Sequence, residues 1–137
     1  MMMNRRHFLD TLGAGSLVAL APIAVRAAPL KRVVVVGGGM AGATAAKYLR
    51  LWSNKTVDVT LVDTSTKYVS NIMSNLVVTG QYGPTILDYG WSNLVKNHGV
   101  KLLNGTVTQV EPGGSLGAWK VTVTGGSTNT ELYCERV

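Results

Sequence analysis

The sequence predicts an α/β fold with a parallel β-sheet followed by an antiparallel β-meander. Three observations support this prediction. Residues 33–36 are four consecutive valines without alternation, which is typical of a strand buried on both faces of a parallel sheet. A glycine-rich turn, a stretch of helical periodicity and a second apolar strand follow directly. Later in the chain, apolar and polar residues alternate over residues 118–124, as in an antiparallel sheet.

Residues 1–27 have the pattern of an export signal. Arg5 and Arg6 precede Phe8, and residues 12–25 carry no charge. This run is shorter than the roughly 20 residues of a membrane-spanning helix. Small side chains at Val25 and Ala27 predict cleavage after Ala27. The arginine pair predicts the twin-arginine route, which exports folded proteins to the periplasm; a Sec signal or an uncleaved anchor is the alternative.

Residues 31–63 form the first predicted unit, a strand, turn, helix and second strand. From Met40 the apolar side chains recur at helical intervals, and Ser53 with Asn54 ends the helix. The second strand covers residues 57–63. Because such crossovers are right-handed, the two strands should lie parallel, with the helix on one face of the sheet.

The turn after the first strand has the spacing Gly-x-Gly-x-x-Gly, with glycines at positions 37, 39 and 42. Gly37 permits a tight turn, and Gly39 has no Cβ that would keep a pyrophosphate away. Gly42, together with Ala46 one turn later, lets the helix lie close to the strands. Amides at the start of the helix would then face the phosphates at the positive end of the helix dipole.

Asp63 ends the second strand, 21 residues after Gly42, where a carboxylate can accept hydrogen bonds from an adenosine ribose. Together with the glycine turn, it predicts a dinucleotide-binding site; a glycine-rich turn in an unrelated α/β domain is the alternative. The predicted cofactor-binding residues are Gly37, Gly38, Gly39, Met40, Ala41, Gly42 and Asp63.

The carboxylate of Asp63 would repel a 2′-phosphate, which disfavours NADP and leaves FAD and NAD. Three features favour FAD. The unit stands at the start of the mature chain, a meander follows the third strand as in flavoprotein folds, and an exported enzyme has no pool of diffusible NAD. NAD remains the alternative.

The rest of the chain predicts further elements of this fold. Residues 64–85 indicate a loop or short helices, and residues 86–98 predict one helix, with Gly99 as its left-handed C-cap. A third strand is expected over residues 100–103, with extended chain over 105–110. The strand over 118–124, a turn at 125–127 and a strand over 131–137 complete the prediction. Because the last strand has no end signal, we expect residues 28–137 to be the truncated N-terminal part of a FAD-binding domain.

Composition excludes several other classes of site. The 13 Lys and Arg residues exceed the 7 Asp and Glu residues, but they are scattered, which argues against nucleic-acid binding. One cysteine allows no internal disulfide and no zinc cluster of the cysteine type, and no acidic residues show metal-ligand spacing.

His98 is interpreted as a helix C-terminal charge. The three tryptophans are interpreted as core or edge packing: Trp52, Trp91 and Trp119.

Residues 31–49 and 59–63, together with Tyr68 and Ser74–Asn75, resemble the flavoprotein subunit of flavocytochrome c sulfide dehydrogenase. That subunit is related to sulfide:quinone oxidoreductases and to flavoproteins with two dinucleotide-binding domains. The resemblance covers residues 31 to about 137. It implies a periplasmic enzyme that oxidises sulfide with FAD, passes electrons to a c-type cytochrome, and meets a membrane only during export. An NAD-dependent dehydrogenase, or a nucleotide-binding fragment without turnover, is the alternative.

Two positions depart from that family. Where the resemblance places a cysteine that tethers the flavin, this chain has Asn71, which cannot form a thioether. The redox cysteine pair of the family would lie beyond Val137, so no catalytic residue is assigned. Cys134 does not match that pair and is interpreted as a half-buried strand residue. The resemblance identifies residues 133–137 with the start of a second FAD-contacting strand.

Overall fold

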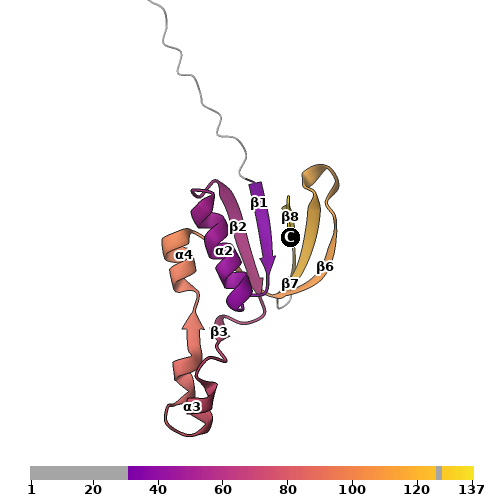
Figure 1. Ribbon diagram of the computed structural model, residues 1–137. Helices are drawn as coiled ribbons and strands as arrows, with labels where there is room; N and C mark the ends of the chain where they lie inside the picture. The colour runs from indigo at the N-terminus through magenta and orange to yellow at the C-terminus, as the bar shows by residue number, and fades with distance from the viewer. Residues whose placement is uncertain (1–30, 126–127) are drawn as a thin grey trace, which may run out of the picture.

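The computed structural model describes residues 31–125 and 128–137. The predicted signal, residues 1–27, and most of the predicted turn at residues 125–127 lie outside the described residues. The described chain forms three layers: helices, a parallel sheet and an antiparallel sheet (Figure 1). The predicted α/β class, with its parallel sheet and meander, is therefore confirmed. No helix among the described residues has the length and apolar character needed to cross a membrane.

The parallel sheet has the strand order β1-β2-β5. Its strands are β1 (Lys31–Val36), β2 (Val57–Asp63) and β5 (Lys101–Asn104), and α2 (Met40–Trp52) connects the first two. β1 and β2 pair in parallel with Val36 opposite Val62, so both strands end at the same edge of the sheet. The glycine turn and Asp63 consequently meet at that edge.

α2 covers one face of the sheet. Ala46 of the helix is fully buried against Val59 and Leu61 of β2 and Val100 before β5, with Val33 and Val35 of β1 packed beside them. These strand positions differ by two, as expected when alternate side chains point to the same face. Each such valine or leucine contributes about 1.5–3 kcal/mol when fully buried.

The antiparallel meander covers the opposite face. It comprises β6 (Thr106–Pro112), β7 (Trp119–Gly125) and β8 (Thr128–Cys134), in that order. Val34 of β1 and Val62 of β2 are buried there against Val121, Val123 and Cys134. The parallel sheet is thus covered on both faces, which explains why the last four residues of β1 are valines without alternation.

After β8 the chain returns to the free edge of β1. The Val34 amide donates to the Arg136 carbonyl oxygen at 3.0 Å, and the Glu135 amide donates to the Arg32 carbonyl oxygen at 2.9 Å. This pairing is parallel. The predicted strand over 131–137 therefore divides: β8 ends at Cys134, and the next two residues add to the parallel sheet. A hydrogen bond from the Arg32 amide lowers the pKa of the Glu135 carboxyl.

Cys134 is completely buried rather than half-buried. Its side chain belongs to the core between the meander and the parallel sheet. Burial raises the pKa of this thiol, which favours the protonated, unreactive form. Cys134 is accordingly a packing residue.

The single helix predicted over residues 86–98 is wrong in its first half. Residues 84–90 form the short helix η1 (Pro84–Leu87) and the strand β4 (Asp88–Gly90), and only α4 (Ser92–His98) is α-helical. β4 pairs with β3 (Lys67–Val69), a partner that helical periodicity does not reveal. With α3 (Ser74–Val78) these elements form an arm that projects from the sheet (Figure 1). Gly99 ends α4 with φ of 66°, as predicted.

Candidate functional site

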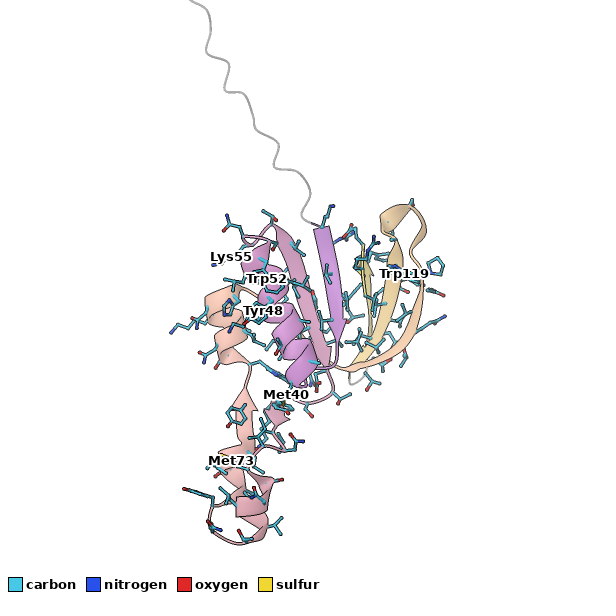
Figure 2. The ribbon with its side chains drawn as sticks, viewed as in Figure 1. Met40, Tyr48, Trp52, Lys55, Met73 and Trp119 are labelled. Carbon is cyan, nitrogen blue, oxygen red and sulfur yellow. The ribbon has the colours of Figure 1, made fainter. Side chains whose placement is uncertain are left out.

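The glycine turn joins β1 to α2 at the carboxyl edge of the sheet. Gly37 has φ of +93°, a conformation that L side chains rarely adopt, and its amide donates to the Val62 carbonyl oxygen at 2.8 Å. Gly39 is the N-cap of α2, and its carbonyl oxygen accepts the first helical hydrogen bond from Ala43 at 2.9 Å. Figure 2 shows Met40 at this end of the helix. The predicted tight turn at Gly37 is therefore present.

The other two glycines of the motif have different surroundings. A Cβ on Gly42 would lie 1.8 Å from the Gly37 carbonyl oxygen, so the helix crosses the turn in direct backbone contact. A Cβ on Gly39 would meet no atom within 4 Å. Gly42 thus serves the packing of helix on strand, whereas Gly39 borders open space, as a site for a ligand outside the protein requires.

The first turn of α2 is suited to an anion. It contains no acidic residue, and no side chain among the described residues forms a capping hydrogen bond at the N-terminus of α2. The first amides of an α-helix have no acceptor inside the helix, so the amides of Met40, Ala41 and Gly42 carry the positive end of the helix dipole. With Gly39 leaving space in front of them, these groups can bind a phosphate.

Asp63 lies beside the turn and already accepts two hydrogen bonds. Its Oδ2 accepts from the Gly38 amide at 2.5 Å, and its Oδ1 accepts from the Ser65 amide at 2.7 Å. A carboxylate has about four lone-pair positions, so two remain for further donors. Asp63 can therefore hold the glycine turn in place and still accept from ribose hydroxyls.

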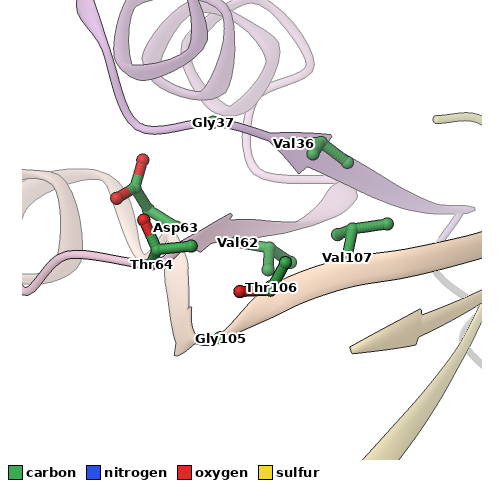
Figure 3. Close-up of a pocket in the computed structure, with 8 residues that line it drawn as sticks. All are labelled: Val36, Gly37, Val62, Asp63, Thr64, Gly105, Thr106 and Val107. Atoms are coloured by element: carbon green, nitrogen blue, oxygen red, sulfur yellow. The ribbon is translucent and has the colours of Figure 1, made fainter. Parts of the chain in front are cut away.

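A pocket of about 230 Å³ opens next to Asp63 at the ends of β1 and β2. Figure 3 shows the Asp63 carboxylate directed toward the turn at Gly37, with the side chains of Val36, Val62 and Val107 in the adjoining part of the pocket. Val36 is 49% exposed although its neighbours along β1 are more buried. A carboxylate at one side and apolar walls at the other suit a nucleoside.

Trp91 is a contact of this site that the sequence did not reveal. Its indole N–H donates to the Gly38 carbonyl oxygen at 3.2 Å, and only 7% of its surface is exposed. The sequence predicted core or edge packing for this residue, within a helix over residues 86–98. It is buried, but it stands before α4 and contacts the glycine turn, and only the tertiary fold brings residues 38 and 91 together.

Other residues named from the sequence lie elsewhere. Asn71 is exposed on the arm, and His98 is the last residue of α4, where its carbonyl oxygen accepts from Arg50 at 2.9 Å. Trp52 is 80% exposed and stacks obliquely on Tyr48, while Trp119 is on the meander; Figure 2 shows them on different elements. None of these residues lines the pocket beside Asp63.

The family model of pyridine nucleotide-disulphide oxidoreductases matches residues 31–132. One curated relative is the flavoprotein chain of sulfide dehydrogenase (flavocytochrome c) from Chlorobaculum thiosulfatiphilum. It is 53% identical over 47 residues, which are 34% of this chain and 96% of that sequence. The matched stretch is short, yet it spans nearly the whole of that sequence.

Solved structures share the fold. The sulfide:quinone oxidoreductase of Aquifex aeolicus superposes with a TM-score of 0.59 at 19% identity, over 77% of this chain and 23% of that one. The reduced CoADR-RHD protein of Bacillus anthracis gives 0.63 at 17% identity, over 77% and 19%. NDH2 from Plasmodium falciparum, in complex with NADH, gives 0.56 at 14%, over 77% and 21%. The chain therefore spans about a fifth of the length of these structures.

The different surroundings of Gly42 and Gly39 predict substitution effects of different size on the stability of the fold. Gly42→Ala should cost about 3 kcal/mol or more in the free energy of unfolding of this domain, because the added methyl group meets a rigid carbonyl oxygen. Gly39→Ala should change it by no more than about 1 kcal/mol, since the Cβ points into open space. Urea unfolding of the full-length protein without cofactor measures both. Equal destabilisation by the two substitutions would contradict the close contact at Gly42.

Proposed function

Because this chain belongs to the pyridine nucleotide-disulphide oxidoreductase family, we propose that it is the FAD-binding part of an exported flavoenzyme that oxidises sulfide. The observation that carries this proposal is the open space at Gly39 in front of the uncapped start of α2, with Asp63 beside it. The family and the flavoprotein relative imply FAD, which is the cofactor predicted from the sequence.

The residues present fit the ADP half of FAD. We assign the pyrophosphate to the amides of Met40, Ala41 and Gly42, which are free of intrahelical acceptors. The remaining lone pairs of Asp63 would accept from the ribose hydroxyls. The apolar part of the adjoining pocket, at Val36, Val62 and Val107, would contact the adenine. Asp63 would also repel a 2′-phosphate at this position.

When bound, FAD supplies the ability to accept two electrons from a reduced substrate. The residues of this chain bind and orient the cofactor, and the buried parallel sheet holds the carboxyl ends of β1 and β2 in fixed register. The sulfide substrate and the c-type cytochrome partner are supported by the relative from Chlorobaculum thiosulfatiphilum, a sulfide dehydrogenase flavoprotein chain of a flavocytochrome c.

Substitution at Gly39 tests the assignment of the phosphate site. Gly39→Val in the full-length protein should weaken FAD binding by roughly 100-fold or more, because the branched side chain would occupy the space in front of the α2 amides. Titration of flavin-free protein with FAD, followed by flavin fluorescence, measures this change. Gly83→Val is the matched control, since Gly83 also has free space around its Cβ position but lies on the arm. Stoichiometric flavin in the Gly39→Val protein would exclude this phosphate site.

We further propose that the flavin is held without a covalent bond. A thioether requires a thiolate, and Asn71 offers only an amide; the hydroxyls of Ser70 and Ser74 are poor nucleophiles at neutral pH. Acid precipitation of the full-length holoprotein should therefore release all flavin into the supernatant. Yellow colour that stays in the washed pellet would show that another residue forms a tether.

Export by the twin-arginine route is a separate proposal, supported by Arg5 and Arg6 before the uncharged run. Replacement of both by lysine should leave the precursor in the cytoplasm, because that route recognises the arginine pair itself and not the charge alone. Cell fractionation with an antibody against the protein measures the distribution. Normal periplasmic accumulation of the lysine variant would indicate the Sec route.

A further inference from the structure

The peptide groups of Gly38 are held from two sides. Its amide donates to Asp63 Oδ2 at 2.5 Å, and its carbonyl oxygen accepts from the Trp91 indole at 3.2 Å. Asp63 ends β2, whereas Trp91 precedes α4, so two separate elements converge on one residue of the turn. Gly38 is itself buried. Its orientation is therefore determined by contacts outside the turn.

The contact with Trp91 also explains the residue type at position 38. The Gly-x-Gly-x-x-Gly motif leaves its second position open to other residues. In this chain a Cβ on Gly38 would lie 2.4 Å from Cζ2 of the Trp91 ring and 3.0 Å from Cε2 and Cη2. The ring is rigid and buried, so it cannot move aside as the end of a flexible side chain could. Gly38 does not have positive φ, which leaves the tryptophan as the reason for glycine.

We propose that Trp91 is a positioning residue for FAD, which acts by fixing the Gly38 carbonyl group. This inference rests on the proposed function. Gly38 is followed by Gly39, the N-cap of α2, so the orientation of the Gly38 peptide group sets the path by which the chain enters the helix. The helix amides assigned to the pyrophosphate follow at once. Without the indole N–H, the buried Gly38 carbonyl has lost a partner and the turn can sample other orientations.

Trp91 also connects the turn to the arm. It follows β4, whose partner β3 leads to Ser70 and Asn71. The indole lines a pocket of about 160 Å³ shared with Asp63 and a pocket of about 230 Å³ shared with Tyr68 and Tyr89 of the arm. Trp91 therefore lies between the arm and the glycine turn.

Trp91→Phe removes the N–H donor and keeps most of the ring. FAD dissociation constants of the full-length protein should rise about 3- to 10-fold, as expected for one lost hydrogen bond. Because the proposed effect acts on the glycine turn, the affinity of the protein for ADP alone should fall by the same factor, as measured by calorimetric titration. Trp52→Phe is the control, since Trp52 is exposed on α2, and it should bind both ligands as wild type does. A residue with only a packing role would lower the unfolding midpoint and leave both affinities unchanged.

Substitutions at Gly38 and Trp91 together give a second test, which does not depend on the Trp91→Phe protein. Gly38→Ala alone should weaken FAD binding at least about tenfold, because the methyl group meets the indole. Gly38→Ala combined with Trp91→Leu should bind FAD more tightly than Gly38→Ala alone, since the smaller side chain leaves room for the methyl group. The proposal would be overturned if the loss of FAD-binding free energy in the double variant equalled the sum of the losses in Gly38→Ala and Trp91→Leu alone.

The wild type and Gly39→Val separate this inference from the proposed function. If wild-type protein binds no FAD, or if Gly39→Val binds it normally, the phosphate site and the role of Trp91 are both overturned. If wild type binds FAD and Gly39→Val does not, while Trp91→Phe matches wild type for both FAD and ADP, only the role of Trp91 is overturned.

Discussion

The close approach of α2 to the turn that precedes it is the constraint on which the site depends. A Cβ on Gly42 would stand 1.8 Å from the Gly37 carbonyl oxygen, a contact that only glycine allows. This approach places the start of the helix beside the ends of β1 and β2, while Ala46, further along the helix, is fully buried against Val59 and Leu61 of β2. The helix amides, the open space at Gly39 and the Asp63 carboxylate are consequently within one small region, as a dinucleotide site requires.

The parallel sheet provides a rigid base for this region because both of its faces are covered. α2 covers one face and the meander covers the other, so successive valines of β1 enter different clusters. Glu135 and Arg136 then add to the free edge of β1. Covering a face with three antiparallel strands, each joined to the next along the chain, needs no further crossover helix. β1 thereby has β2 on one side and the returning chain on the other.

Asp63 has a structural role in addition to its proposed role in binding the ribose. Its position at the end of β2 suits it to receive a ribose, and its two hydrogen bonds to the Gly38 and Ser65 amides organise the turn and the next loop. Trp91 completes the arrangement from the opposite side of Gly38. The glycine turn is therefore supported by residues from β2 and from the segment before α4. Under the proposed function, this arrangement would make cofactor affinity depend on residues far from the motif in sequence.

Elements with local signals could be predicted from the amino-acid sequence. Four consecutive valines, glycines at fixed spacing, a helical stripe and an acidic residue at a strand end were sufficient to predict β1, α2, the exact residues of β2 and the shape of the turn. The alternation in β7 likewise predicted which of its side chains are buried. The remaining features depend on contacts between distant parts of the chain. β4 is a strand because β3 pairs with it, Cys134 is buried because the meander folds onto the sheet, and Trp91 meets Gly38 across 53 positions of sequence. Such contacts depend on the path of the whole chain, and local periodicity carries no information about them.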